Sequence, residues 1–582
     1  MYKTFYKACE KLADIRAVDF FFAKEVLNLI NVTEGREVLF HLLMKLMHLY
    51  GDGHSCINIE DVANKTIFAT DKSEDGLIKL GFKMPSANKI KDILDSLNYD
   101  NLPIYFAKEY NSLYIKRLWY YENEIADFIR FKIQQKTRKK DSIENIVSQL
   151  FDQGEEVSYQ KEAIIKSLEY NFSIISGGPG TGKTTTVAKL LLALELINNE
   201  PQKIVLLAPT GKAAQRMTES LKNTLNNIIT KEIPNFLQKN NNLQQDKKCL
   251  DDVLNHLNTL QAQTLHRFLG LRPNSSYVKY DKNSKAAYDV VVVDESSMLD
   301  INIFIKLIRS VRYDAKLILI GDSNQLPSVE AGSLLSNLTY DVNGKVMKYT
   351  TLLLKNYRSQ QYINNLALSV LKGDISNDSN DNINFYSLNK LDAYLKKYAQ
   401  KYLQLDKCKN YKEALVELSK FRILVANKKL EIGTDFLNYK IEKLMSRPIG
   451  QNYKGKPIMI TQNSYALGLF NGDVGIIWPD SSGKLRAYFE GREDKSFSLN
   501  MLPKYESVYV MTIHKTQGSE FDEVVIILPE EDNRVLSRQL LYTAITRAKN
   551  KLTIISNKSL LRDIVQKVIQ RNSNINNLLD NN

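Results

Sequence analysis

The segment GGPGTGKTTT, residues 177–186, has the residue types and spacing of a phosphate-binding loop. It contains G-x4-G-K-T between the apolar strand pattern FSIIS and the helical pattern VAKLLLALELI, which argues against a chance glycine turn. Glycines let backbone N–H groups turn toward phosphate oxygens, and the following helix adds the positive end of its dipole. Lys183 would reach the β- and γ-phosphates, and the Thr184 hydroxyl would coordinate Mg²⁺. The residues predicted to bind nucleotide in this loop are Gly177, Gly178, Pro179, Gly180, Thr181, Gly182, Lys183, Thr184 and Thr185.

Two adjacent acids, Asp294 and Glu295, end the apolar strand pattern VVVV. Asp294 suits Mg²⁺ coordination, directly or through water, and Glu295 suits polarising an attacking water. The next strand pattern leads into GDSNQLPSVEAG, residues 321–332. Ligands of such sheets bind beyond the carboxyl ends of the strands, so Gln325 is placed to contact the γ-phosphate and the attacking water. The alternatives are a solvent-facing strand cap for the acids and an ordinary polar turn for Gln325.

Two arginines in the second half of the chain are candidates for the same reaction: Arg358 in LLLKNYRS and Arg547 in LYTAITRAK. A γ-phosphate that is losing its bond spreads charge over three oxygens, and a guanidinium donated across a cleft stabilises that charge. Two such arginines would let hydrolysis open and close the cleft. The alternative for each is a solvated position on a helix.

Three segments at predicted strand ends are dense in hydrogen-bond donors: APTGKAA (208–214), AQTLHRFLG (262–270) and TIHKTQGSEF (512–521). Hydroxyls, amides and backbone N–H groups at strand ends make sequence-independent contacts with single-strand phosphates. Ordinary capped turns are the alternative. The six histidines and four cysteines show no metal-ligand spacing, so we predict no separate metal cage.

Short apolar runs alternate with helical patterns in two long stretches, 116–345 and 346–582. Continuous apolar runs between helices are typical of parallel strands buried on both faces, so we predict two α/β units. Between about 445 and 505, short strands with glycine turns predict a small all-β insertion. Residues 222–252 are rich in Asn, Gln and Lys and predict a surface insertion, and the polar tail RNSNINNLLDNN predicts a frayed end.

Residues 1–115 have mainly helical patterns and contain no phosphate loop or catalytic constellation. We therefore predict a docking or scaffolding domain. A charged helical pattern, KRLWYYENEIADFI, follows it and leads into the basic stretch 136–140. This stretch is interpreted as a linker or a strand-contacting arm.

The composition restricts the class of protein. The chain has 582 residues, of which 43% are hydrophobic and 25% charged, which indicates a soluble globular protein of several domains. No apolar run is as long as a membrane span, and charged residues interrupt any signal-peptide core, so we expect a cytoplasmic protein with no membrane partner. The net charge is 79 − 66 = +13, which is compatible with a nucleic-acid partner. Lys- and Asn-rich genomes, however, give many proteins such a charge.

The motifs as a set resemble superfamily 1 helicases of the 5′-to-3′ branch: GGPGTGKTTT, LLAPTGKAA, QTLHRFLG, VVVVDESSMLD, GDSNQLPSVEAGS, NYRS, TIHKTQGSEF and LLYTAITRAK. Two further stretches, AVDFFFAKEVL and PIMITQNSYALGLFNGDVGIIW, narrow the resemblance to the RecD family, the alpha chains of bacterial exodeoxyribonuclease V (the RecBCD complex). The resemblance covers nearly the whole chain. It implies an α/β fold of two RecA-like motor domains, with a small SH3-like insertion in the second and a mainly helical N-terminal domain.

The resemblance also implies a function. The chain would be an ATP-dependent 5′-to-3′ DNA helicase in a heterotrimer with RecB-like and RecC-like subunits, and its N-terminal domain would dock on the RecC-like subunit. The complex would act on single-stranded DNA and DNA ends, in double-strand-break repair by homologous recombination and in degradation of linear DNA. The cofactors implied are ATP and Mg²⁺. No nuclease acid cluster is evident beyond the pair at the predicted ATP site, so the nuclease centre is expected on another chain.

Individual roles follow from matching each motif to the family. Gln160, in YQKEAI, resembles the glutamine that reads adenine, and Thr184 and Asp294 match the metal ligands. The residues that match the catalytic positions are Lys183, Glu295, Gln325, Arg358 and Arg547. The residues that match the DNA track are Thr210, Thr264, His266, Thr512, His514 and Gln517.

Two other functions stay open. The chain could be a stand-alone helicase of the same branch, but such relatives carry a longer N-terminal region with helix-hairpin-helix glycine turns, and none precedes Gly177. It could instead be an ATP-binding regulatory subunit that does not translocate. The sequence argues against this second alternative, because no hydrolytic residue is missing.

Overall fold

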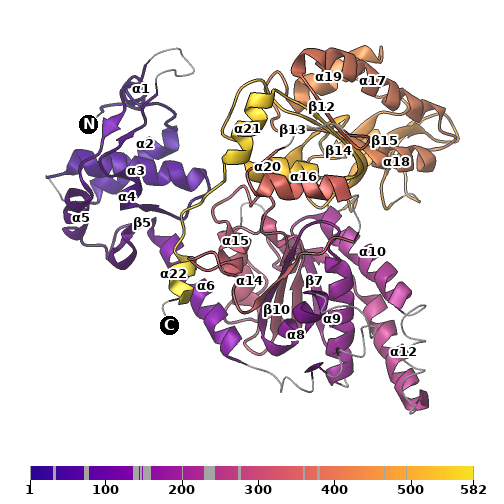
Figure 1. Ribbon diagram of the computed structural model, residues 1–582, viewed down its shortest axis with the longest axis horizontal. Coiled ribbons are helices and arrows are strands. Elements are labelled where there is room, and N and C mark those ends of the chain that lie inside the picture. Colours follow the sequence, from indigo (N-terminus) through magenta and orange to yellow (C-terminus); the bar gives the residue numbers. More distant parts are fainter. Residues whose placement is uncertain are drawn as a thin grey trace.

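The computed structural model arranges the chain as an N-terminal domain beside two stacked α/β units (Figure 1). The residues that it describes are 2–30, 34–70, 78–135, 143–144, 147, 159–198, 201–228, 243–272, 275, 277–357, 361–375, 380–464, 466–492 and 494–580. Arg358 and the basic stretch 136–140 lie outside these ranges. The two parallel-sheet units and the mainly helical N-terminal region confirm the predicted fold class.

The first α/β unit is built on a six-stranded sheet in the order β11-β6-β10-β9-β7-β8, and every neighbouring pair is parallel. Its strands are β6 (Phe172–Gly177), β7 (Ile204–Ala208), β8 (Gln263–Thr264), β9 (Val290–Val293), β10 (Lys316–Gly321) and β11 (Thr350–Leu353). Its helices are α8 (Tyr159–Glu169), α9 (Lys183–Asn198), α10 (Gly211–Asn227), α12 (Leu243–Thr259), α13 (Leu265–Phe268), α14 (Ile301–Ser310) and α15 (Leu334–Thr339).

Alternate residues of β9 explain why its four consecutive valines are needed. Val291 and Val293 join the apolar cluster beneath α14, whereas Val290 and Val292 join the cluster beneath α8, α9 and α10. Because both faces of the sheet are covered, every position of this strand must be apolar.

The second α/β unit has a five-stranded parallel sheet in the order β12-β21-β20-β13-β19. Its strands are β12 (Ile383–Tyr386), β13 (Phe421–Val425), β19 (Val510–Thr512), β20 (Phe521–Ile527) and β21 (Ala548–Ile555). Its helices are α16 (Gln361–Leu371), α17 (Leu391–Leu403), α18 (Tyr411–Lys420), α19 (Thr434–Leu444), α20 (Arg538–Ile545) and α21 (Lys558–Gln566).

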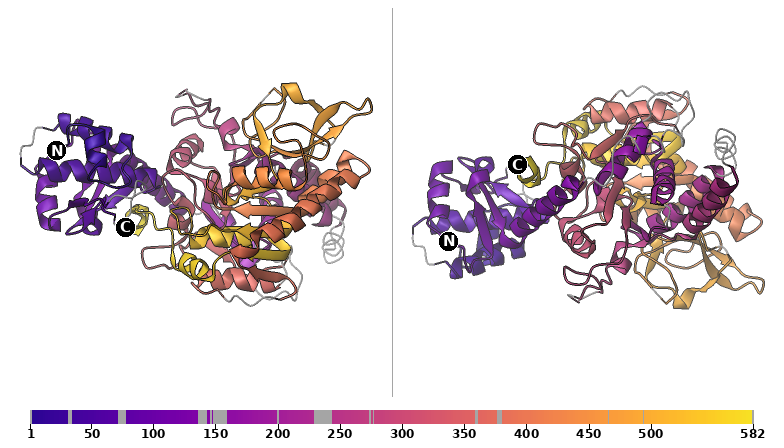
Figure 2. Two further views of the ribbon diagram at one scale, coloured as in Figure 1. Left: turned by 90° about the horizontal axis from the view of Figure 1, so that it is seen from above. Right: turned by 90° about the horizontal axis from the view of Figure 1, so that it is seen from below.

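A separate antiparallel sheet interrupts the second unit between α19 and β19. Its order is β17-β16-β15-β14-β18, with strands β14 (Pro457–Ile460), β15 (Val474–Pro479), β16 (Leu485–Phe489), β17 (Phe497–Ser498) and β18 (Tyr505–Ser507). Figure 2 shows this sheet at the opposite end of the molecule from the N-terminal domain. The segment is all-β as predicted from its glycine turns, and its likeness to an SH3 domain stays a prediction.

The N-terminal domain combines helices with two small antiparallel sheets. The helices are α1 (Phe5–Cys9), α2 (Ala17–Asn28), α3 (Arg36–Gly51), α4 (Ile59–Val62) and α5 (Ala87–Asp95). The strands are β1 (Cys56–Asn58), β4 (Ile104–Ala107) and β5 (Ser112–Ile115) in one sheet and β2 (Thr66–Ile67) and β3 (Phe82–Lys83) in the other. The sequence pattern predicts mostly helix here, because four-residue apolar runs do not distinguish a strand from a helical turn.

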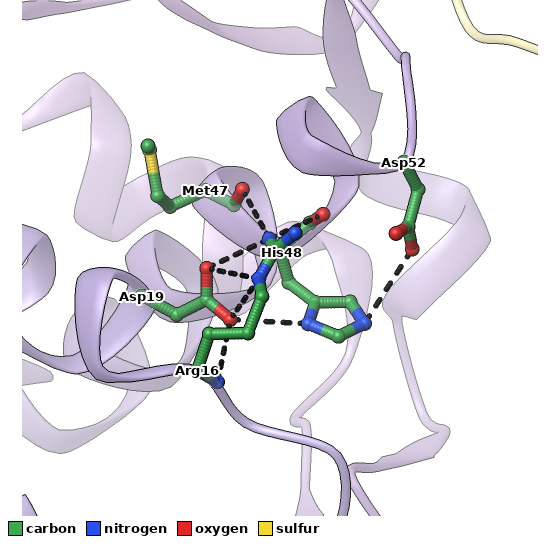
Figure 3. A network of polar contacts seen from close by, with 5 residues as sticks. All are labelled: Arg16, Asp19, Met47, His48 and Asp52. Carbon is green, nitrogen blue, oxygen red and sulfur yellow. Dashed lines mark hydrogen bonds and ion pairs between the residues drawn. The ribbon is translucent and has the colours of Figure 1, made fainter. Parts of the chain in front are cut away.

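A buried polar network fixes the start of α2 against the end of α3 (Figure 3). The fully buried carboxylate of Asp19 accepts hydrogen bonds from the Arg16 guanidinium and lies 3.1 Å from Nδ1 of His48. Arg16 also donates to the backbone oxygens of Met47 and His48, and His48 Nε2 lies 3.5 Å from Asp52. Burial opposes ionisation, but the hydrogen bonds from His48 and Arg16 hold the pKa of Asp19 below its usual value.

Residues 571–580 of the C-terminal tail have a defined structure, so the prediction that the tail frays is wrong for this part. The tail forms α22 (Ile575–Asp580), which lies beside α6 (Lys116–Gln134), the helix that leads from the N-terminal domain into the first unit (Figure 1). The buried carboxylate of Glu122 on α6 accepts hydrogen bonds from Ser573 Oγ at 2.6 Å and from Asn574 N at 3.0 Å. Two of the polar residues of the tail, Ser573 and Asn574, therefore satisfy this buried acid rather than face solvent.

Within the Asn-rich stretch 222–252, α10 continues to Asn227 and α12 begins at Leu243. The residues 229–242 that join them lie outside the described ranges. Among the helices of the described part, none has the length and apolar character needed to cross a membrane.

Candidate functional site

The phosphate-binding loop joins the end of β6 to the start of α9, as the motif predicts. Gly180 and Gly182 have φ values of +78° and +82°, a left-handed backbone that side chains disfavour. A Cβ at Gly182 would lie 2.2 Å from Nε2 of Gln160, so the glutamine amide borders the loop directly. Gln160 lies on α8, and its contact with adenine stays a prediction.

Lys183, the first residue of α9, folds back over the loop. Its Nζ donates hydrogen bonds to the backbone oxygens of Gly177 at 2.7 Å and Gly178 at 2.9 Å. The Thr181 hydroxyl also donates to Gly178 O, at 2.8 Å. The loop therefore places a lysine ammonium and the free N–H groups at the start of α9 on one small concave surface, which suits the anionic phosphates of a nucleotide.

The two acids lie at the end of β9, two strands away from β6 in the sheet. Burial, and then the charge of the neighbouring Glu295, raise the pKa of Asp294 to about 6, while Lys183 opposes the rise. Glu295 has a φ of +50°, which is strained for a residue with a side chain. Such strain often occurs at functional sites, and here it turns the backbone sharply between β9 and the short helix 296–298.

Gln325 lies in the loop after β10, the strand next to β6. The hydroxyls of Ser176 and Ser323 are 3.1 Å apart, which ties this loop to the end of β6. Gln325 Nε2 donates to Asp322 at 3.2 Å, while its buried Oε1 has no hydrogen-bond partner within the described ranges. Gln325 is therefore held close to the phosphate-binding loop with one acceptor atom unused.

The segment just before Arg358, which leads from β11 of the first unit toward α16 of the second, contacts the phosphate-binding loop. Tyr357 N donates to Gly180 O at 2.8 Å, and Asn356 Nδ2 donates to Pro179 O at 3.0 Å. A cavity of about 40 Å³ lies beside these contacts. It is lined by residues of both units, among them Gly178, Gly180, Asn356, Tyr542, Thr546 and Lys549.

Several of the residues that line this cavity are absent from the predicted site, among them Asn356, Tyr542 and Lys549. Each belongs to one of the motifs NYRS and LLYTAITRAK, which sequence analysis singled out for their arginines alone. Their positions close to those arginines in the sequence could have indicated them. No spacing rule indicates which of the neighbouring residues faces the loop.

Arg547 is almost fully buried at the end of α20. Its guanidinium donates to the backbone oxygens of Thr543 at 3.1 Å and Ser519 at 3.0 Å. Both acceptors belong to the second unit. In this arrangement the arginine supports its own unit, and its contact with a γ-phosphate stays a prediction.

The candidate DNA residues fall into two groups, one on each unit. Thr210 follows β7, and Thr264 ends the adjacent strand β8; their hydroxyls accept hydrogen bonds from the first turns of α10 and α13. Thr512 ends β19 in the second unit, and Gln517 Nε2 donates to Leu326 O of the first unit at 3.1 Å. The hydrogen bond from Gln517 thus connects the group on the second unit to the first unit.

The two histidines of the predicted track, His266 and His514, have similar surroundings. Burial is the largest cause for each, and it lowers the pKa of both imidazoles below the usual value. Each ring is therefore neutral near pH 7 and offers hydrogen bonds rather than charge to a phosphate backbone.

The all-β insertion rests on the first unit at the start of α10. Lys212 Nζ lies 3.3 Å from Glu490 Oε2, and a Cβ at Gly211 would lie 2.9 Å from the Phe470 ring. Arg216 of the same helix donates to Gly518 O in the second unit. The helix that follows APTGKAA is therefore in contact with both the insertion and the loop TIHKTQGSEF.

Known proteins are similar to a part of each α/β unit and to the chain as a whole. Residues 160–331 match an AAA domain, and residues 507–555 match the UvrD-like helicase C-terminal domain. The RecBCD enzyme subunit RecD of Haemophilus influenzae is 30% identical over 655 residues, which cover 98% of this chain and 99% of that relative. The RecBCD enzyme subunit RecD of Mycolicibacterium smegmatis is 32% identical over 474 residues, covering 78% and 80%. A solved structure of two coordinating Pif1 helicases at forked DNA is 16% identical, covers 72% of this chain and 95% of that one, and has a TM-score of 0.40.

Two parallel α/β units that meet at a phosphate-binding loop, together with the matched domains, define an ATP-dependent DNA helicase. The similarity to RecD extends over nearly the full length of both chains, so it identifies a family within this class. The chain belongs to the RecD family of RecBCD enzyme subunits.

Proposed function

We propose that the chain is the ATP-driven 5′-to-3′ helicase subunit of a cytoplasmic RecBCD-type helicase-nuclease. With RecB-like and RecC-like subunits it unwinds DNA ends for double-strand-break repair by homologous recombination and for degradation of linear DNA. The observation that carries this proposal is the cavity beside the phosphate-binding loop, which Gly178 and Gly180 of the first unit line together with Tyr542 and Thr546 of the second. A nucleotide in that loop lies where the two units meet, so its hydrolysis can change how they are held together. The test is ATP hydrolysis by the purified full chain, which single-stranded DNA should stimulate. Hydrolysis that does not respond to single-stranded DNA would contradict the proposal.

The similarity favours a complex subunit over a stand-alone helicase. The Haemophilus RecD matches this chain over 99% of its own length, so the chain has the domain content of a RecBCD subunit. An ATP-binding subunit without hydrolysis is disfavoured by the intact set around the loop, which includes Lys183, Asp294 and Glu295. The nuclease centre is expected on another chain.

The residues around the loop fit ATP with Mg²⁺. A buried carboxyl whose pKa is raised to about 6 ionises readily when a cation neutralises its surroundings, which suits Asp294 as a ligand. Mg²⁺ would be held by Asp294 and the Thr184 hydroxyl, and when bound it neutralises phosphate charge. Glu295 would accept the proton of the attacking water, and Gln160 would contact the adenine.

Gln325, Arg358 and Arg547 are proposed to respond to the γ-phosphate. Arg547 can reach a phosphate only by leaving the backbone oxygens of Thr543 and Ser519. Its proposed role therefore requires a rearrangement within the second unit when ATP is bound. Such a change would link the state of the nucleotide to the loop 516–519, which adjoins the proposed DNA track.

Single-stranded DNA is proposed to contact the strand-end residues Thr210, Thr264, His266, Thr512, His514 and Gln517. These groups are hydroxyls, amides and neutral imidazoles, and they suit sequence-independent contacts with the DNA backbone. The net charge of +13 adds a general attraction for DNA.

DNA binding by the full chain should weaken steeply with salt and vary little with base sequence. Contacts with phosphates release counterions, so affinity falls with ionic strength, whereas base-specific contacts would discriminate between sequences. Fluorescence anisotropy with single strands of different composition, each measured at several salt concentrations, checks both expectations. A strong preference for one short motif at fixed salt would count against the proposed track.

The N-terminal domain is proposed to dock on the RecC-like subunit through apolar side chains that α1 and α2 leave exposed. These side chains are Tyr6 (81% exposed), Val18 (50%), Phe21 (51%) and Leu29 (63%). The neighbouring Phe20 is 1% exposed and belongs to the core of the domain. The exposed set can therefore be changed without opening that core.

Phe21→Asp should reduce co-purification with the RecB-like and RecC-like subunits by about tenfold or more, because a charge in the core of an interface is strongly disfavoured. DNA-stimulated ATP hydrolysis and the unfolding temperature of the isolated chain should not change. Val416→Asp, at a similarly exposed position (56%) on α18, is the matched control. Assembly of the Phe21 variant at full stoichiometry would place the docking surface elsewhere.

A further inference from the structure

The loop that follows β10 is bonded to the second unit at three points. Tyr542 OH donates to Asp322 Oδ2 at 2.9 Å, and Leu326 N donates to Thr543 Oγ1 at 2.9 Å. Gln517 Nε2 donates to Leu326 O at 3.1 Å. Tyr542 and Thr543 lie on α20, and Gln517 lies in TIHKTQGSEF, so this loop of the first unit is connected to two functional segments of the second.

Asp322 connects one of these contacts to Gln325. The Asp322 side chain is 1% exposed, and its Oδ2 accepts hydrogen bonds from both Tyr542 OH and Gln325 Nε2. A carboxylate can only accept, so the nitrogen of the Gln325 amide must face it and the oxygen must face away. That oxygen, Oε1, is buried and has no hydrogen-bond partner among the residues that the structure describes. A buried acceptor without a partner is rare, and here it is available to a donor that arrives with the ligand.

The pair lies against the phosphate-binding loop. A Cβ at Gly178 would be 3.0 Å from Tyr542 OH and 3.9 Å from Asp322 Oδ2, so a side chain at this position would crowd the tyrosine hydroxyl. Burial, and then the negative charge of Asp322, raise the pKa of Tyr542 well above its usual value. The phenol therefore keeps its proton at neutral pH and remains the donor in this hydrogen bond.

We propose that Tyr542 and Asp322 are positioning residues for ATP hydrolysis. Tyr542 fixes the Asp322 carboxylate, and Asp322 orients Gln325 so that Oε1 accepts a hydrogen bond from the attacking water. The water oxygen bonds to the γ-phosphorus, the bond from that phosphorus to the β–γ bridging oxygen breaks with its electrons on ADP, and the water proton passes to Glu295. This inference rests on the proposed function and adds the link between the two units that the function requires.

The link also explains how hydrolysis could depend on closure of the cleft. Tyr542 belongs to the second unit and Asp322 to the first, so the hydrogen bond between them exists only while the units are together. Separation of the units removes the donor from Asp322 and frees the Gln325 amide to rotate. Water is then no longer held for attack, and hydrolysis stops until the units close again.

The test is Tyr542→Phe in the full chain, which removes one hydroxyl and keeps the ring. The kcat of DNA-stimulated ATP hydrolysis should fall about 10- to 100-fold, because misplacing a reacting group has effects of that size. The KM for ATP and the affinity for adenylyl imidodiphosphate should stay within about twofold, because the groups act on the transition state and not on binding. Tyr402→Phe is the matched control, because its buried hydroxyl donates to Tyr509 O within the second unit.

Asp322→Asn, alone and combined with Tyr542→Phe, supplies the second measurement. Both single variants should show the same split between kcat and KM, and the double variant should be no slower than the slower single variant, because the two residues act in series. The inference is overturned by a wild-type kcat for Tyr542→Phe, by parallel losses of nucleotide affinity and kcat, or by multiplicative effects in the double variant. A wild-type chain without DNA-stimulated hydrolysis would overturn the proposed function as well, so the two failures are distinguishable.

Discussion

Lys183→Ala should lower the rate of DNA-stimulated ATP hydrolysis about 100- to 1,000-fold, the size of effect expected when one preorganised donor to developing charge is removed. The Lys183 ammonium lies over the phosphate-binding loop, with Gly177 O and Gly178 O as its hydrogen-bond partners. Because these contacts lie in the nucleotide site and not in an apolar core, the variant should fold normally. Steady-state hydrolysis and thermal unfolding, measured together, check both parts of the expectation.

The matched control is Lys345→Ala, which removes an exposed lysine of the same α/β unit. It should hydrolyse ATP at the wild-type rate, which separates the loss of a charge in general from the loss of this charge. Near-normal hydrolysis by a folded Lys183→Ala chain would show that nucleotide is processed elsewhere.

Glu295→Gln should produce the second large effect, a fall in kcat of about 100- to 10,000-fold, the range found for a lost general base. Glutamine has nearly the same shape but cannot take the proton of the attacking water. Nucleotide affinity should persist, because the acid acts on the water and not on the phosphates. The left-handed backbone at this position, with a φ of +50°, is the same for both side chains, so the substitution adds no new strain.

Equilibrium binding of an ATP analogue, measured beside steady-state hydrolysis, tests this separation. If binding and turnover fell by the same factor, Glu295 would be a ground-state contact and the base would have to be another residue. Asp294→Asn offers a useful comparison, since loss of the proposed metal ligand should weaken the dependence of binding on Mg²⁺.

The parts of the site that could be predicted are those whose chemistry is local in the sequence. The phosphate-binding loop carries its glycines, its lysine and both flanking elements within about thirty residues, as such motifs do. The valines of β9 likewise predict a strand buried on both faces, because the pattern shows in four consecutive residues. For these features, the spacing of residues in the sequence is enough to predict the local structure.

The parts that could not be predicted depend on partners far apart in the chain. Asp322 and Tyr542 are separated by 220 residues, and neither motif shows by itself that the two side chains meet. The prediction that the C-terminal tail frays was wrong for the same reason. Asn574 is polar in sequence, but its backbone N–H and side chain contact the buried Glu122 and Tyr114, which lie more than 400 residues earlier.

This tail also restricts how the N-terminal domain can be tested. A cut after residue 115 would remove Tyr114, whose hydroxyl donates to Glu122 at 2.9 Å. It would also remove Ser55, whose N–H donates to Asn572 O at 2.9 Å. In the remaining chain, the carboxyl of Glu122 would be exposed or left without its hydrogen-bond partners. The resulting instability of the truncated chain would be mistaken for lost docking. Single substitutions on the exposed face of α2 avoid this confusion.

Strand separation measures the central claim most directly. Purified full chain is given ATP, Mg²⁺ and duplexes that differ only in carrying a 5′ or a 3′ single-stranded overhang, with the Lys183→Ala chain in parallel. We expect the wild-type chain to separate the 5′-overhang duplex in an ATP-dependent reaction, and the variant to separate neither. Separation that proceeds only from the 3′ overhang, or that the Lys183→Ala chain performs as well as wild type, would contradict an ATP-driven 5′-to-3′ helicase.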